Sequence, residues 1–137
     1  MSPTSVKMTG TIFAVLVALV TVPPVLAHHS FATEYDRTKP VSVTGVVKKV
    51  EWRNPHIWFY VDVKDAKDQV TNWNLELASP NVLVRQGWTR TSLHVGDQVT
   101  VNGAQAKDGS KMGNARTVTL ADGRKVFAGS PSSGGNQ

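Results

Sequence analysis

The sequence predicts an all-β domain, a small closed barrel of five to six strands. Three observations favour this fold class. Several segments alternate between apolar and polar residues, as half-buried strands do. A Val- and Thr-rich segment, residues 41–52, carries Gly45 near its middle, which suits a long strand that bends inside a barrel. One short helix signal lies between the third and fourth strand signals, which is the order of an OB-like Greek-key barrel. An SH3-like barrel or a small sandwich is the alternative.

A β-hairpin is expected after the bent strand. In residues 56–63 the apolar side chains of one face occupy the odd-numbered positions. Residues 70–77 alternate again, with the apolar side chains at the odd-numbered positions from Trp73 onward. A charged turn at residues 64–69 joins the two segments. The period of two indicates two neighbouring strands with one buried face.

The helix signal follows the hairpin. Ser79 is a favourable N-cap, Pro80 suits the first helical position, and Gly87 can end the helix. We therefore expect two helical turns at one end of the barrel. Three later strands complete the pattern, at residues 98–106, 115–120 and 125–127.

The first residues have the pattern of an export signal. Lys7 precedes an apolar run at residues 12–20, and two prolines and a short Val-Leu-Ala stretch follow. A membrane-spanning anchor, the alternative, needs about 20 apolar residues, and this run is far shorter. Small residues at positions 25 and 27 indicate cleavage after Ala27. We expect a periplasmic or secreted protein with no membrane span after cleavage.

Four regions follow from these patterns. They are a signal peptide at residues 1–27, an amino-terminal arm at residues 28–40, an OB-like barrel at residues 41–128 and a disordered tail at residues 129–137. In the arm, Phe31 and Tyr35 are expected to pack on the barrel. Among the tryptophans outside the hairpin's polar face, Trp52, Trp73 and Trp88, we expect at least two to be buried.

Composition excludes several function classes. The chain has no cysteine, so disulfide scaffolds, thiolate nucleophiles and cysteine-ligated zinc are ruled out. Its net charge of +5 is spread over 137 residues without a dense basic run, and nucleic acid is not an expected partner. None of the sequence motifs of the common hydrolases, metalloproteases or nucleotide-binding enzymes is present. We expect a binding or accessory protein rather than an enzyme.

Histidine at the expected new amino terminus indicates a metal site. The free amine of His28 and its own ring Nδ1 can close a chelate around one ion. Nitrogen ligands favour copper among divalent first-row ions, and the arrangement is similar to the histidine brace of copper monooxygenases and of some periplasmic copper carriers. His56 is the expected second imidazole, His29 can assist, and His94 is a weaker candidate. The alternative is a flexible arm, with His56 capping a turn or hydrogen-bonding its strand.

The polar face of the hairpin indicates a second kind of site. Trp58 and Tyr60 are expected to lie beside Asn72, Asn74 and Glu76 of the next strand. Aromatic rings with amides and a carboxylate can bind a glycan, a peptide or an envelope protein, and OB folds often use this sheet face. The alternatives are that the arm or the helix covers these rings, or that the protein is a structural subunit of an envelope complex.

The chain as a whole resembles a family of small exported bacterial proteins catalogued as a family of unknown function, the domain of unknown function 6152 family. The matching stretches are residues 28–31, 34–36, 50–56, 72–73, 87–88, 95–97, 114–116 and 122–127. They extend over nearly all of the chain after residue 27. The resemblance implies one secreted or periplasmic domain and supplies no reaction or ligand.

Overall fold

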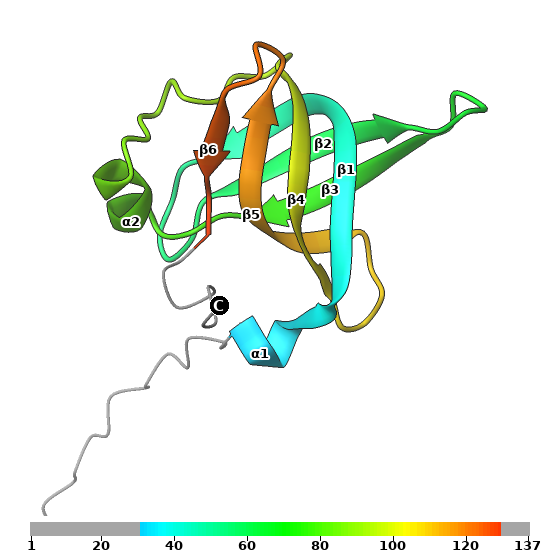
Figure 1. Cartoon of the computed structure of the whole chain (residues 1–137), viewed down its shortest axis with the longest axis horizontal. Helices are drawn as coiled ribbons and strands as arrows, with labels where there is room; N and C mark the ends of the chain where they lie inside the picture. Colours follow the sequence, from blue (N-terminus) through cyan, green and yellow to red (C-terminus); the bar gives the residue numbers. More distant parts are fainter. Residues whose placement is uncertain (1–30, 130–137) are drawn as a thin grey trace, which may run out of the picture.

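One 17-residue strand, β1, organises the fold. The computed structural model describes residues 31–129, and every structural statement below concerns this part of the chain. Figure 1 shows the strands curving around a common interior, with one short helix near the described amino end and another beside the barrel. The elements are α1 (Phe31–Glu34), β1 (Tyr35–Glu51), β2 (Trp58–Lys64), β3 (Val70–Glu76), α2 (Pro80–Arg85), β4 (Gln98–Ala106), β5 (Met112–Leu120) and β6 (Lys125–Phe127).

The six strands form a single closed sheet in the order β3, β2, β1, β4, β5, β6. All neighbours in this order are antiparallel, and a parallel pairing of β3 with β5 closes the ring. With α2 between β3 and β4, this is the predicted OB-like Greek-key barrel. The predicted fold class is therefore confirmed.

Gly45 lies where β1 passes from one neighbour to the other. The strand pairs with β4 as far as Val46 and with β2 from Val46 onward. A Cβ atom at Gly45 would lie 2.2 Å from the carbonyl oxygen of Asp62 in β2. Only glycine permits this close approach of two backbones, which explains why a glycine stands in a Val-rich strand.

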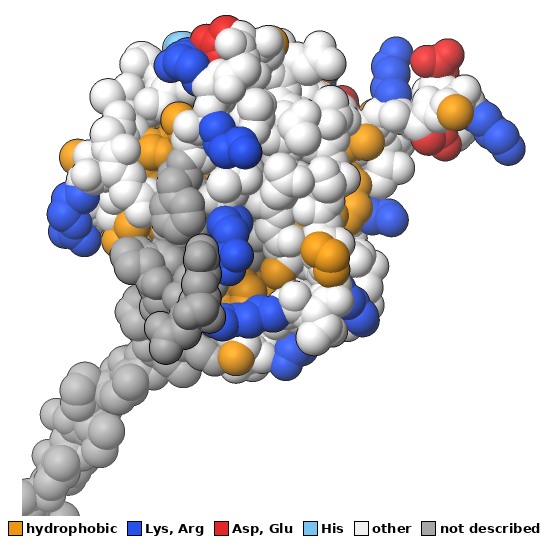
Figure 2. All heavy atoms as spheres, in the orientation of Figure 1, with side chains coloured by type: hydrophobic (Ala, Val, Ile, Leu, Met, Phe, Trp, Pro, Cys, Tyr) orange, Lys and Arg blue, Asp and Glu red, His pale blue; other side chains and the backbone are white. Residues whose placement is uncertain are grey.

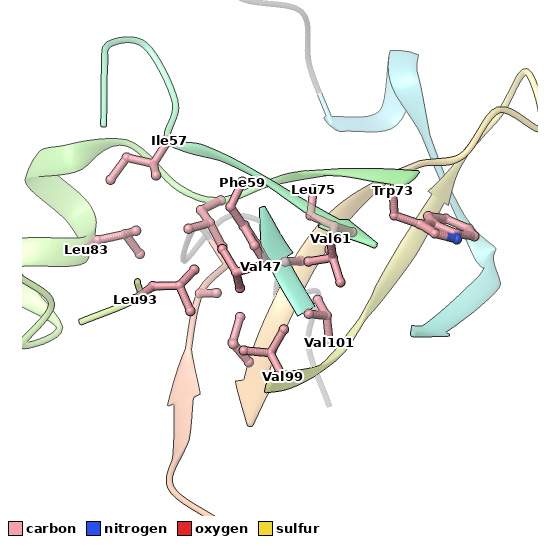
Figure 3. Packing of buried hydrophobic residues seen from close by; sticks show 14 of the residues in the cluster. Val47, Ile57, Phe59, Val61, Trp73, Leu75, Leu83, Leu93, Val99 and Val101 are labelled. Atoms are coloured by element: carbon pink, nitrogen blue, oxygen red, sulfur yellow. The ribbon is translucent and has the colours of Figure 1, made fainter. Parts of the chain in front are cut away.

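The barrel interior is filled from every strand of the closed ring and from α2. The alternation predicted for the hairpin is present: Ile57, Phe59 and Val61 are fully buried. Figure 3 shows these side chains meeting others from β1, β3, β4 and α2. Trp73 and Trp88 belong to the same core, at 8% and 3% exposed, so two of the three expected tryptophans are buried.

Helix α2 has the predicted ends. Ser79 is the N-cap, and its hydroxyl accepts a hydrogen bond from the backbone N–H of Val82 at 3.4 Å. Pro80 occupies the first turn, and Gly87 follows the helix with a φ of +89°, a left-handed value that glycine adopts without strain. The buried side chain of Leu83 attaches the helix to the barrel.

The amino-terminal boundary of the barrel differs from the expectation. The segment at residues 28–40 was expected to be an arm, but β1 begins at Tyr35 and pairs with β4 from there. The register shifts between Asp36 and Pro40, and residues 37–39 have no partner in this ladder. Because the pairing is interrupted there, apolar and polar residues do not alternate regularly, and the sequence pattern does not reveal the start of the strand. Helix α1 directly precedes β1.

Two other expected regions lie outside the described residues: the signal peptide at residues 1–27, and the tail at 129–137 from residue 130 onward. Across residues 31–129, no helix combines the length and the apolar character that crossing a membrane requires. The peptide bond before Pro55, in the turn that leads to β2, is cis.

Candidate functional site

Glu76, at the end of β3, is the one charged side chain buried within residues 31–129. Its residue is 5% exposed. Across the sheet it lies opposite Trp58 of β2 and Asn114 of β5, since the parallel pairing that closes the barrel begins here. A buried carboxylate requires hydrogen-bonding partners, because burial without them is costly.

His56 is the first partner of this carboxylate. The Nδ1 atom of its ring forms a short contact with Oε1 of Glu76. The adjacent Ile57 fixes the backbone, since its N–H donates to the carbonyl of Ala78 at 3.2 Å and its carbonyl accepts from Leu77 at 2.8 Å. An ionised carboxylate can only accept a hydrogen bond, so the contact with an ionised Glu76 needs a proton on Nδ1, and a neutral ring then has its lone pair on Nε2.

Asn114 is the second partner. Its side-chain amide donates to Oε2 of Glu76 at 3.4 Å. The carboxylate is thus held at both oxygens, by side chains that come from β5 and from the turn before β2. The His56 side chain is 36% exposed against 7% for Glu76, so the pair joins a buried anion to a ring that reaches the surface.

Tyr35 completes this group, which we call the Glu76 cluster: Tyr35, His56, Glu76 and Asn114. Tyr35 is 2% exposed, and its hydroxyl makes no hydrogen bond of acceptable geometry within residues 31–129. Burial raises the pKa of this hydroxyl, and the nearby Glu76 carboxylate raises it further. The tyrosine therefore keeps its proton, and its buried hydroxyl lies near the Glu76 carboxylate.

The cluster also fixes where the amino-terminal segment enters the barrel. The rings of Phe31 and Tyr35 lie 5.5 Å apart, centroid to centroid, and the N–H of Lys107 donates to the carbonyl of Glu34 at 2.9 Å. His28 and His29 lie outside the described residues. Three residues of extended chain span at most about 10 Å, so the expected new amino terminus lies within that distance of Phe31.

Chemically, the His56 and Glu76 pair matches a common support of metal-binding histidines. Such a histidine usually donates its second ring N–H to a carboxylate, which fixes the tautomer and the ring orientation. Within residues 31–129, however, no group of three or more His, Asp or Glu side chains is placed to hold a metal ion. A complete metal site would need ligands from residues that precede Phe31.

The predicted hairpin platform is only partly assembled. Trp58 is half buried, and Asn74 is exposed. The Tyr60 hydroxyl donates to Oε2 of Glu51 at 3.1 Å, and the Asn72 amide donates to an Asp62 oxygen at 3.0 Å. These two polar groups are therefore already engaged within the sheet.

Glu76 lies on the expected face of β3, the same side as Asn72 and Asn74, but it is buried there rather than exposed. The side chains of His56 and Asn114 contact its carboxylate at the end of the strand. Two members of the cluster, Tyr35 and Asn114, were not predicted as site residues at all. Their proximity depends on how the barrel closes, and no local pattern shows it.

A network of charges surrounds Glu51 on the hairpin's outer side. Lys49 approaches one carboxylate oxygen at 2.5 Å, and Arg53 approaches the other at 3.0 Å. The hydrogen bond from Lys49 lowers the pKa of Glu51, and burial followed by the bond to Glu51 raises the pKa of Tyr60. His94, the weaker metal candidate, lies apart from this network, with Nδ1 3.8 Å from an Asp97 oxygen.

Comparison with known proteins identifies a family but no activity. The chain belongs to a family of unknown function, DUF6152, whose model matches residues 15–116. No curated protein matches the chain, and no solved structure does. The protein is therefore an all-β, barrel-forming member of that family, and its function has to be inferred from its own residues.

Proposed function

We propose that this is an exported, non-enzymatic binding or accessory protein that coordinates Cu²⁺ through its processed amino terminus. The amine and ring of His28 supply two nitrogens, His56 supplies a third through Nε2, and His29 assists. One observation carries the proposal: buried Glu76 orients the His56 ring through Nδ1, so that Nε2 is the nitrogen left to bind a ligand.

The donor chemistry favours Cu²⁺ over other ions. Amine and imidazole nitrogens suit copper, which heads the affinity order of divalent first-row metals. The chain has no cysteine, so no thiolate is present to favour Cu⁺. The chelate needs a free amine on a histidine, so it requires that His28 or His29 be the first residue after cleavage. The proposal assigns a ligand and no reaction.

Copper titration of four proteins tests this proposal. The reference begins at His28, and the second protein is the same chain with its terminal amine acetylated. The other two are His56→Ala and, as a matched control, His94→Ala. We expect acetylation to remove the strong binding, His56→Ala to weaken it, and His94→Ala to leave it unchanged. Equal, weak binding by the first two proteins would refute the chelate.

Intact mass of the secreted protein, with and without added copper, gives an independent test. A first residue of His28 and one bound copper ion are the expected result. Material that begins at neither His28 nor His29 would remove the chelate and leave the barrel without an assigned ligand. The same measurement tests the proposed export.

A second candidate function uses the hairpin face to bind a glycan, a peptide or an envelope protein. What favours it is the pairing of half-buried Trp58 with exposed Asn74 on the polar side of the hairpin. Under this alternative, Trp58→Ala should abolish partner capture and leave the melting temperature almost unchanged. A large loss of stability would instead place Trp58 in the core.

A further inference from the structure

A hollow of about 450 Å³ lies where the start of β1 meets β4 and β5. Phe31, Val41 and Ala104 supply apolar surface, and Arg37, Asn114 and Arg116 supply polar groups. This volume lies in the range of small-molecule sites, which are mostly apolar with a few placed polar groups. Asn114 also belongs to the Glu76 cluster, so the hollow adjoins that cluster.

Both arginines stand at irregularities of the sheet. Arg37 is in the part of β1 that has no β4 partner, between Asp36 and Pro40. Arg116 is the extra residue of β5, because Asn102 pairs with Thr117 while Gly103 pairs with Ala115. Bulges change the direction of a side chain and are frequent beside binding sites. Each of the two irregularities therefore brings one guanidinium to the hollow.

The charged side chains that line the hollow are basic, Arg37 and Arg116, and the Glu76 carboxylate lies behind Asn114, whose amide donates to it at 3.4 Å. None of the described residues that line the hollow is acidic. The nearest carboxylate in sequence, Asp36, is occupied by its own turn, since it accepts from the backbone N–H of Thr38 at 2.9 Å. Figure 2 shows basic side chains with hydrophobic ones between them on the face where β5 and β6 lie in front, while acidic side chains gather at the top and at the hairpin tip.

Phe31 gives the hollow an aromatic wall and orients one arginine. The Arg37 guanidinium lies over the Phe31 ring, 4.9 Å from its centroid. A planar guanidinium at this position matches a carboxylate in a two-point contact. An apolar wall beside such a group fits a ligand that is apolar at one end and anionic at the other.

We propose that this hollow binds a monocarboxylate with an apolar or aromatic body. Its carboxylate contacts Arg37 and Arg116, and its body packs on Phe31, Val41 and Ala104. None of the described residues that line the hollow is one of the proposed copper ligands.

Three probes test the charge and the apolar body separately, by calorimetry on the full secreted protein without copper. They are naphthoate, the neutral naphthalenemethanol, and acetate, which lacks the apolar body. We expect naphthoate to bind at least about tenfold more tightly than naphthalenemethanol, because a hydrogen bond to a charged group adds about that factor. It should also bind more tightly than acetate, because acetate has no apolar body to bury. Equal binding of naphthoate and naphthalenemethanol would overturn the proposal.

Matched variants locate the site. Arg37→Gln and Arg116→Gln should each weaken naphthoate binding about tenfold, while Arg85→Gln, on α2, should not. Ala104→Leu fills the hollow and should abolish binding, with circular dichroism showing whether the barrel remains folded. If Ala104→Leu unfolds, chemical shifts in labelled protein serve instead, and naphthoate should move the Asn114 side-chain amide signal. Unchanged affinity in both arginine variants would overturn the proposal.

Discussion

The Glu76 carboxylate connects side chains from three separate segments, and replacing it tests that role. Glu76→Ala leaves the His56 N–H and the Asn114 amide, both half buried, without their acceptor, and we expect a loss of about 1 kcal/mol for each hydrogen bond. Glu76→Gln keeps one acceptor oxygen and should lose less of the free energy of unfolding. Urea denaturation measures both, with Asp62→Ala on the outer face as control. Equal losses for Ala and Gln would contradict this account.

The buried hydroxyl of Tyr35 permits a test at alkaline pH. Burial raises the pKa of its hydroxyl, so the folded state holds this proton to higher pH than the unfolded state, and stability falls above pH about 10. Tyr35→Phe should reduce that alkaline loss. At neutral pH it should not destabilise, because the hydroxyl has no well-formed hydrogen bond among the described residues. A loss above about 1 kcal/mol would show that the hydroxyl donates to Glu76.

For single residues, the sequence predicts which face of a strand a side chain occupies better than it predicts whether that side chain is buried. Alternation placed Ile57, Phe59 and Val61 in the core correctly. It also gave the right face for Glu76, but it could not show that side chains from other segments, His56 and Asn114, contact the carboxylate there. Burial of a polar residue depends on contacts between distant segments, which a local pattern does not contain.

Among the elements, β1 carries the strictest requirement on its sequence. Gly45→Ala would force a Cβ atom to within 2.2 Å of the Asp62 carbonyl oxygen, and we expect a loss of about 3 kcal/mol or more. Gly109→Ala is the control: its φ is +77° and no atom lies near the added methyl, so it should cost about 1–2 kcal/mol. Thermal unfolding of both variants separates the clash from the backbone effect.

Elements with regular periods and capping residues were predictable, and irregular ones were not. Helix α2 follows from Ser79, Pro80 and Gly87, and β4 and β6 have the predicted bounds. The start of β1 was missed because its register shifts after Asp36. The bulge at Arg116 was missed for the same reason: an extra residue disturbs the period by which strands are recognised.

For the whole molecule, exposed carboxylates set the response to acid. Hydrogen bonds lower the pKa of Asp36, Glu51, Asp108 and Asp122. A lowered pKa in the folded state gives stability that is present above the unfolded value and lost as pH falls through the folded one. The melting temperature should therefore fall below pH about 4.

Glu51→Gln provides the control for this acid response. Its partner Lys49 has a raised pKa, chiefly through the hydrogen bond to Glu51, so the two groups are linked. The variant should show a shallower acid decline than the wild type, measured as melting temperature against pH. Because these groups are exposed, added salt should also reduce the decline. An identical slope in both proteins would contradict the role of Glu51.

The pairing of β1 with β4 also determines how this chain reaches its native state. Thr44 and Thr100, whose hydroxyls are 2.9 Å apart, are separated by 56 positions along the chain. Such distant pairing is kinetically slow, because the intervening loop must be ordered before the contact stabilises anything. During that delay the long edge of β1 remains open to strands of other molecules. Dilution should therefore favour successful refolding, and crowding of newly made chains should favour aggregation.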